Sequence, residues 1–257
     1  EAEDPLPTVG SLSNLGTVGQ IMGGRTEVTF GQWIDVLRWS LSNGYAYGGE
    51  SYSPGGDAQM RAALSATAAA QLIGTSNLTS PGISKGGFDY PVTGVNYYDV
   101  TKWCNALSER SSLTPVYYTD RNMTQSTVSS TAIYRTGNSA PNGIRELNGY
   151  RLPDRSEYAT LASGADRNKS NLNIQGRLGS MAPVGSYPAG ATTAGIHDTI
   201  GNAWEWTDDE IFMYGRWFSR YYGGGYRQPT TDSLWRNATR LRDRMHEVGF
   251  RIIRNVN

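Results

Sequence analysis

The chain has 257 residues, with 23 basic and 23 acidic side chains and a formal net charge of zero. At roughly 150 residues per domain, this length predicts one large domain or two small ones. The balanced charge argues against nucleic acid as the partner, because proteins that bind nucleic acid usually carry a basic patch or stripe. With 31 glycines and 16 tyrosines, the composition is that of a turn-rich, aromatic-rich globular protein rather than a disordered chain or a coiled coil.

Cysteine and histidine are scarce. Cys104 is the only cysteine, and His197 and His246 are the only histidines. These counts exclude a disulfide framework, a zinc site built from cysteines and a metal site built from several histidines. No apolar run approaches the ~20 residues that a membrane-spanning helix needs. Because the chain starts at Glu1 rather than Met, we expect that an N-terminal segment, with any signal peptide or lipid anchor, has been removed.

Helical patterns are concentrated in the first two thirds of the chain. Apolar spacing or alanine content predicts helices over about 29–42, 58–73 and 97–110, and a short one that opens within 151–158. The expected N-caps are Thr29, Asn96 and either Asp154 or Ser156. Cys104 lies on the apolar face of its helix, so we expect it to be a core residue rather than a reactive thiol.

The remaining segments favour short strands and turns. Residues 1–20 are polar and broken by glycine and proline, so we expect an irregular segment followed by a single domain over 21–257. Strand-like pieces occur at 116–118 and 132–134, and no long helix is predicted after residue 165. This order of elements predicts an α+β fold.

Motifs recur along the chain in a characteristic order. The most distinctive is Asp-Thr-Ile-Gly-Asn-Ala-Trp-Glu-Trp at 198–206, and others lie at 91–99, 148–153, 182–188, 223–226, 236–240 and 249–251. The ordered set, from about residue 26 to 254, resembles the formylglycine-generating-enzyme (sulfatase-modifying factor) domain family. The resemblance implies a C-type-lectin-like fold, with a twisted, mostly antiparallel sheet, two main helices and long loops.

The resemblance does not extend to the thiol chemistry of the oxidase members. Those enzymes carry two cysteines shortly after the glycine-rich element, whereas the matching stretch here, 225–233, contains none. Serine and glutamine cannot replace a thiolate. Related sulfoxide synthases use a histidine-rich iron site, which two distant histidines do not match. We therefore expect no enzymatic activity and no catalytic cofactor.

The resemblance leaves open whether the protein binds one structural calcium ion. The family's calcium ligands match Asp198, Gly201, Ala203 and Glu205, which combine the carboxylate and main-chain oxygens that Ca²⁺ prefers. The alternative is that Asp198 caps a turn and Glu205 pairs with an arginine, without an ion. The same resemblance predicts that Trp204 and Trp206 are core residues, and that Arg236 and Arg240 are buried in ion pairs.

Residues 212–246 combine aromatic residues, arginine and serine, with no acidic residue before Asp232. This chemistry is typical of binding surfaces. The position of this segment resembles that of the C-terminal strip in the variable proteins of diversity-generating retroelements, whose adenine-containing codons are diversified. Trp217 and Trp235 would then be fixed scaffold residues. The candidate contact residues are Phe212, Tyr214, Arg216, Phe218, Ser219, Arg220, Tyr222, Tyr226, Asn237, Thr239, Arg242 and His246.

These observations predict a non-enzymatic, ligand-binding protein displayed on the cell surface or secreted. Its expected partner is a protein or another cell-surface ligand and not nucleic acid. Contact with a membrane would come only through a removed N-terminal anchor, and we expect a monomer. Two alternatives stay open: a divergent oxidoreductase of the same family, and a binding module of fixed specificity.

Overall fold

The computed structural model describes residues 15–18, 21–47, 88–168, 172–174, 179–229 and 231–255. The helix predicted over 58–73 lies outside these residues. Among the described residues, no helix combines the length and the apolar character needed to cross a membrane.

The other predicted helices are confirmed. They are α1 (Phe30–Leu41), α4 (Tyr97–Arg110) and α5 (Arg155–Leu161). Each begins where a side chain caps it: Thr29, Asn96 and Asp154 accept a hydrogen bond from a main-chain N–H in the first turn. Such a bond satisfies one of the amide groups that a helix N-terminus leaves unpaired. Short 3₁₀ helices span Gln125–Thr127, Ser130–Ala132 and Pro188–Gly190.

The strands form three small sheets in the described part of the chain. β1 (Leu15–Val18), β2 (Ile21–Gly24) and β9 (Ile253–Asn255) make an antiparallel sheet, and β3 (Tyr117–Tyr118) pairs with β4 (Asn142–Gly143). The four-stranded sheet has the order β7-β6-β5-β8, from β5 (Trp204–Met213), β6 (Arg216–Tyr222), β7 (Arg236–Arg240) and β8 (Val248–Phe250).

Two local predictions need correction. β1 lies within the segment 1–20 that was expected to be irregular, because pairing with β2 orders it. The piece 132–134 forms no regular strand: Ala132 ends a 3₁₀ helix, and Ile133 makes only an isolated bridge with Tyr118. The α+β class itself is confirmed.

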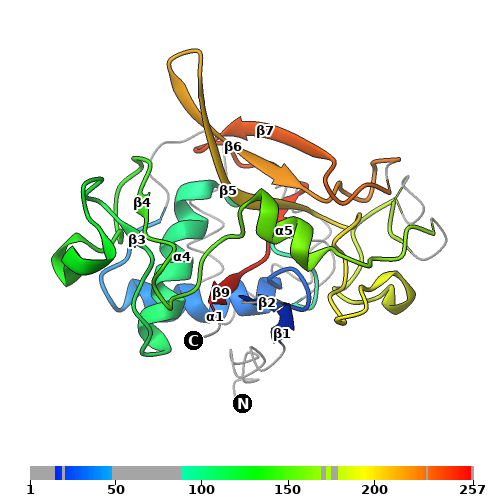
Figure 1. Cartoon of the computed structure of the whole chain (residues 1–257), viewed down its shortest axis with the longest axis horizontal. Helices are drawn as coiled ribbons and strands as arrows, with labels where there is room; N and C mark the ends of the chain where they lie inside the picture. Colours follow the sequence, from blue (N-terminus) through cyan, green and yellow to red (C-terminus); the bar gives the residue numbers. More distant parts are fainter. Residues whose placement is uncertain are drawn as a thin grey trace, which may run out of the picture.

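The long hairpin β5–β6 stands out from the body of the molecule. In Figure 1 its tip projects at the top of the view, while α1 and α4 lie on the other side of the base of the sheet. β5 and β6 pair in antiparallel fashion, with a register irregularity between Trp206 and Glu210. β7 covers one edge of β6, and β8 runs parallel to the first residues of β5.

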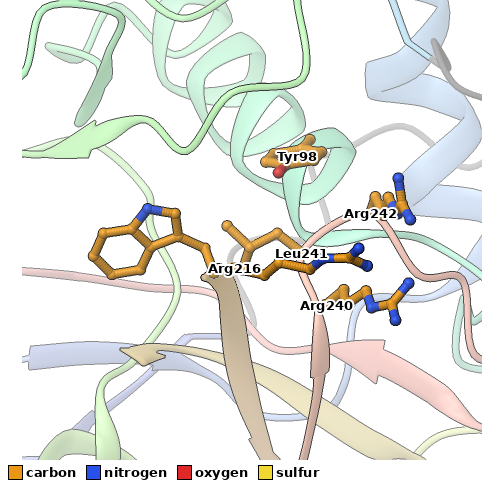
Figure 2. A pocket seen from close by; sticks show the side chains of 6 residues that line it. Tyr98, Arg216, Arg240, Leu241 and Arg242 are labelled. Carbon is orange, nitrogen blue, oxygen red and sulfur yellow. The ribbon is translucent and has the colours of Figure 1, made fainter. Parts of the chain in front are cut away.

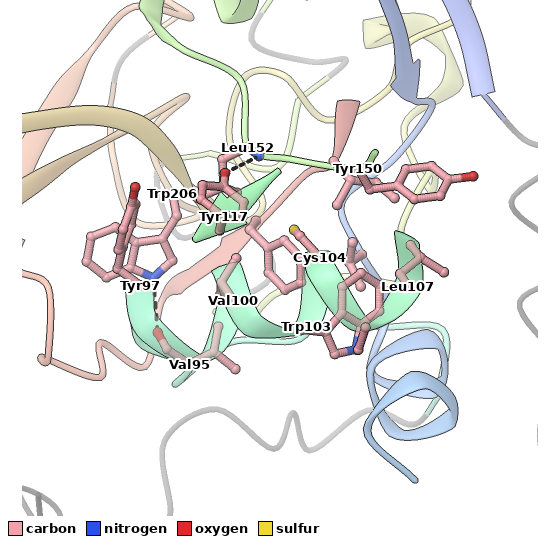
Figure 3. Close-up of a cluster of buried hydrophobic side chains, with 14 of the residues drawn as sticks. Val95, Tyr97, Val100, Trp103, Cys104, Leu107, Tyr117, Tyr150, Leu152 and Trp206 are labelled. Carbon is pink, nitrogen blue, oxygen red and sulfur yellow. Dashed lines mark hydrogen bonds between the residues drawn. The ribbon is translucent and has the colours of Figure 1, made fainter. Parts of the chain in front are cut away.

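An aromatic core joins α1, α4 and the base of the sheet (Figure 3). Trp33 and Trp103 stack with ring centroids 5.9 Å apart, and Phe250 meets Trp103 edge-on at 5.3 Å. Trp206 donates its indole N–H to the Val95 carbonyl at 3.0 Å. Cys104 is fully buried in this cluster, and burial raises the pKa of its thiol. The prediction of a core cysteine is confirmed.

Candidate functional site

Burial changes steeply along the β5–β6 hairpin. Trp206 and Tyr221, which face each other near its base, are buried, whereas Tyr214 at the tip is 93% exposed. Tyr214 and Gly215 connect the strands, and both have positive φ, at 50° and 72°. Two consecutive positive φ values are the mark of the tight type I′ turn, whose twist matches that of the flanking strands. The sequence therefore builds a regular hairpin and leaves its end in solvent.

Aromatic and apolar side chains gather at this end. We call it the hairpin tip, and its exposed residues are Phe212, Met213, Tyr214, Arg216 and Trp217. The rings of Phe212 and Trp217 pack with centroids 5.2 Å apart, and the Arg121 guanidinium lies 5.3 Å from the Trp217 ring. Contiguous exposed apolar surface of this kind is typical of interaction sites.

Hydrogen bonds hold the lower half of the hairpin in place. Ser219 donates its hydroxyl to the Thr207 carbonyl at 2.6 Å. Tyr222 and Arg220 both donate to the Asp209 carboxylate, at 2.7 and 2.8 Å. The tip is thus carried by a base in which Ser219, Arg220 and Tyr222 have hydrogen-bond partners within the protein.

Three predicted contact residues are corrected by this geometry. Ser219 and Tyr222 are fully buried, and Tyr226 is 7% exposed. Ser219 and Tyr222 are three residues apart in β6 and therefore lie on opposite faces of the strand, and each is buried: Ser219 donates to the Thr207 carbonyl, and Tyr222 packs against Tyr158. Arg220 is only half-buried, but its guanidinium is paired with Asp209. These residues position the hairpin rather than offer contacts.

The other candidates divide into two groups. Phe212, Tyr214, Arg216 and Arg242 are exposed at or beside the hairpin tip, and Phe218 is half-buried next to it. Asn237 and His246 are also exposed, but no interaction among the described residues links them to the tip. Thr239 is half-buried and donates to Asp243 at 2.6 Å.

A cavity of about 380 Å³ lies beside the hairpin tip. It is lined from β6, from the end of β7 and from the first turn of α4, by Tyr98, Arg216, Trp217, Arg240, Leu241 and Arg242. We call it the arginine pocket. Figure 2 shows three guanidinium groups gathered at one end of it, with Tyr98 at its edge.

Sequence reasoning missed several residues of this surface. Arg240 and Arg236 were expected in buried ion pairs, yet Arg236 is exposed, Arg240 lines the pocket, and neither has an ion-pair partner among the described residues. Trp217 and Trp235 were assigned to the scaffold but are 39% and 48% exposed. Only the packing of β7 against β6 brings Arg240 beside the tip, so no local pattern could have indicated it.

In the segment that matches the family's calcium site, the carboxylates bind donor groups of the protein rather than pointing together around a cation. Both oxygens of Glu205 accept from the Arg251 guanidinium, at 2.9 and 2.7 Å. Asp198 accepts from the Gly185 N–H at 2.6 Å, and Gly201 and Ala203 are buried in the same loop. These residues do not fit a calcium site as placed, because one of the two carboxylates is already neutralised. The arrangement matches the alternative in which Glu205 pairs with an arginine.

A third carboxylate, Glu27, lies in this buried region. Asn202 donates its side-chain amide to Glu27 at 3.0 Å. Burial, and then the charges of Asp198 and Glu205, raise the pKa of Glu27 well above its ordinary value. Burial also raises the pKa of Asp198 and Glu205. The region is an interior network built around Arg251. Trp204 and Trp206, on either side of Glu205 in β5, are buried in the aromatic core cluster, as predicted.

The sequence matches the Sulfatase-modifying factor enzyme 1-like domain over residues 24–256. The chain belongs to this family. A stretch of 63 residues is also 36% identical to hercynine oxygenase of Mycobacterium tuberculosis (strain ATCC 25618 / H37Rv). That stretch covers 21% of this chain and only 15% of the oxygenase, so the chain spans a small part of that relative.

Three solved structures share the fold. A crystal structure of CarF superposes with a TM-score of 0.66 at 22% identity, covering 92% of this chain and 87% of CarF. Treponema denticola variable protein 1 gives a TM-score of 0.60 at 19% identity, with coverage of 94% and 91%. PvdO from Pseudomonas aeruginosa gives 0.56 at 17% identity, with coverage of 91% and 80%. The predicted C-type-lectin-like fold of this family is confirmed, and the variable protein shares this fold.

Proposed function

We propose that this chain is a non-enzymatic ligand-binding protein, displayed on the cell surface or secreted, whose strip 212–246 is diversified by a retroelement. One observation carries the proposal: the hairpin tip is exposed and aromatic, while the base that carries it is buried and hydrogen-bonded. Such a division lets contact residues change without loss of the fold. The likeness to Treponema denticola variable protein 1 supports the same interpretation.

The position of the candidate residues supports this division. Phe212 and Tyr214, at the tip, are neither part of the aromatic core cluster nor packed against it, and Arg216 and Arg242 are exposed. Tyr and Phe supply large contact area at low entropic cost, and Arg supplies directional hydrogen bonds. The expected ligand is a protein or another cell-surface molecule rather than nucleic acid, since the chain has no net positive charge.

The cysteine content supports a binding role over oxidase chemistry. The stretch 225–233 carries no cysteine, and the single thiol of the chain, Cys104, is buried among apolar side chains. Burial raises the pKa of this thiol, which keeps it in the unreactive protonated form. A paired-thiol mechanism therefore has no residues to perform it in this sequence.

Sequencing codons 205–257 across a population of the source organism tests the proposal. The expected result is variation confined to exposed positions such as Phe212, Tyr214, Arg216 and Arg242, with the buried Ser219 unchanged. Tryptophan codons contain no adenine, so Trp217 and Trp235 would stay constant. An invariant strip would refute diversification and leave a binding module of fixed specificity.

The identity to hercynine oxygenase favours a second candidate, a divergent oxidoreductase. Oxygen consumption by the purified protein tests it, with copper or iron added and a cysteine-containing peptide as substrate. Turnover above that of a heat-denatured sample would support this candidate and contradict the first one.

A further inference from the structure

The arginine pocket has a marked chemical character. None of its lining residues is acidic, and three of them are arginines. Its volume of about 380 Å³ is at the small end of the range for binding pockets, which suits one or two side chains rather than a large ligand. The guanidiniums of Arg216 and Arg240 carry like charges beside one cavity, so both would attract an anion inside it.

Other arginines of the same region have partners within the protein. Arg220 pairs with Asp209 at 2.8 Å, and Arg227 pairs with Glu247 at 3.2 Å. By contrast, no carboxylate among the described residues forms an ion pair with Arg216 or Arg240. The contrast indicates that these two guanidiniums are available to a ligand.

The acid nearest to the pocket in sequence, Asp243, binds neutral donors and forms no ion pair with Arg216 or Arg240 in the described part of the chain. One oxygen of Asp243 accepts from the Thr239 hydroxyl at 2.6 Å and from the Arg240 main-chain N–H at 3.2 Å. Asp243 therefore caps the end of β7. Arginine presents a planar fork of donors that matches a carboxylate with two parallel hydrogen bonds. The pocket thus offers the donors but not the acceptor.

The surface next to the pocket is apolar. Trp217 lines the pocket and packs against Phe212, and Met213 and Tyr214 continue the exposed surface to the turn. A ligand that fills the pocket with an anion would therefore place its neighbouring groups on aromatic and apolar side chains. A peptide carries aliphatic and aromatic side chains next to carboxylates, which match the apolar Phe212 and Met213 beside the arginines.

We propose that the arginine pocket binds carboxylate side chains of an acidic segment in a protein ligand, and that the hairpin tip packs against apolar residues beside them. This inference rests on the proposed function and specifies the ligand chemistry of the same site. Arg216 and Arg240 contact the carboxylates, and Trp217 contacts the adjoining apolar side chain. Association is expected to weaken as ionic strength rises, because exposed charges are screened.

The test uses the full chain and a displayed library of random 12-residue peptides. Peptides are selected in parallel on the wild type, on the double variant R216Q/R240Q and on R236Q. Arg236 is an exposed arginine on the same strand as Arg240 but does not line the pocket, so R236Q is the matched control. Thermal unfolding first establishes that all three proteins are folded.

The wild type and R236Q are expected to enrich peptides with Asp or Glu beside Leu, Tyr or Phe, and the double variant is not. In calorimetry, an enriched peptide is expected to bind the double variant at least tenfold more weakly and R236Q within twofold. Replacing its acidic residues with Asn and Gln is expected to produce the same loss. Enrichment without acidic bias, equal binding to the double variant or no enrichment at all would overturn the inference.

Three further outcomes distinguish the failure of this inference from the failure of the proposed function. Displacement of the peptide by a sulfated tetrasaccharide that binds more tightly would overturn the peptide as occupant. Peptides that lose affinity for Y214A but not for R216Q/R240Q would refute the arginine pocket and still support binding at the tip. An invariant strip together with acidic selectivity would refute diversification and leave the pocket standing.

Discussion

Arg251 and Glu205 form a two-point ion pair in the interior of the protein. The guanidinium donates from Nε and Nη2 to the two carboxylate oxygens at 2.9 and 2.7 Å, and neither side chain is exposed. Arg251 also donates to the carbonyls of Gly24 and His197, both at 2.8 Å. The side chain of Arg251 thus links the C-terminal end of the chain to β2 and to the segment before β5.

Removing one partner of this pair is expected to be strongly destabilising. Glu205→Gln should lower the free energy of unfolding by about 3–5 kcal/mol, because it leaves the Arg251 charge buried without its counter-ion. Urea unfolding followed by fluorescence measures the change. Arg220→Gln is the matched control, since it breaks a partly exposed pair and should cost about 1 kcal/mol or less. Equal costs for the two variants would contradict the role of the buried pair.

The same pair predicts the response to calcium. A ligand that binds only the folded state raises the unfolding temperature as its concentration exceeds its Kd. Because both carboxylate oxygens of Glu205 are bound by Arg251, we expect the unfolding temperatures in millimolar CaCl₂ and in EGTA to agree within about 1 °C. A stabilisation of 1 kcal/mol would raise the unfolding temperature by roughly 2–4 °C. A rise of several degrees, lost on Asp198→Asn, would instead support the calcium site that the family resemblance implies.

Aromatic residues at the two ends of the hairpin are expected to differ in their effect on stability. Tyr214→Ala, at a position 93% exposed, should change the free energy of unfolding by no more than about 0.5 kcal/mol. Tyr222→Ala, at a fully buried position, should cost about 3 kcal/mol or more. Chemical denaturation of both variants measures this. A large loss of stability for Tyr214→Ala would show that the tip is part of the scaffold.

Ligand affinity, unlike stability, is expected to depend on the exposed aromatic residues at the hairpin tip. Truncating Trp217 or Phe212 to Ala should weaken a peptide or protein ligand by about 2 kcal/mol or more, because central aromatic residues dominate interface energetics. Calorimetry with a selected ligand measures the loss, and unfolding curves exclude a folding defect. Trp235→Ala, an exposed tryptophan that does not line the arginine pocket, is the control and should bind within about twofold.

Glu210, in β5 below the tip, predicts a pH dependence of stability. Burial, and then the charge of Asp208, raise the pKa of Glu210 from 4.5 to about 7. The folded protein therefore binds more protons than the unfolded chain between these values, so stability falls as pH rises from about 4.5 to about 7. At about 1.4 kcal/mol per pKa unit, the loss is up to about 3 kcal/mol.

Glu210→Gln tests this assignment. The variant should be more stable than the wild type at pH 8, and its stability should depend less on pH between 5 and 7. Urea unfolding at several pH values measures both. Glu146→Gln, at an exposed position, is the matched control and should follow the wild type. Identical pH profiles for Glu210→Gln and the wild type would contradict the raised pKa.

Local predictions succeeded where neighbouring residues decide the structure. Thr29, Asn96 and Asp154 cap the predicted helices because a capping bond spans only three residues. The failures lie in the binding strip. Ser219 and Tyr222 are of residue types common in binding sites but are buried, and Arg240 was expected in the interior but lines a pocket.

The sequence by itself determined the helices, the core cysteine, the missing thiol pair and, through its ordered motifs, the family and the α+β fold. Helix caps and apolar periodicity act over a few residues, so they can be recognised along the chain. Only the tertiary structure decided which half of the hairpin is exposed, and that Arg216 of β6, Arg240 of β7 and Tyr98 of α4 surround one cavity. Strand pairing and burial join residues far apart in sequence, and no local pattern encodes them.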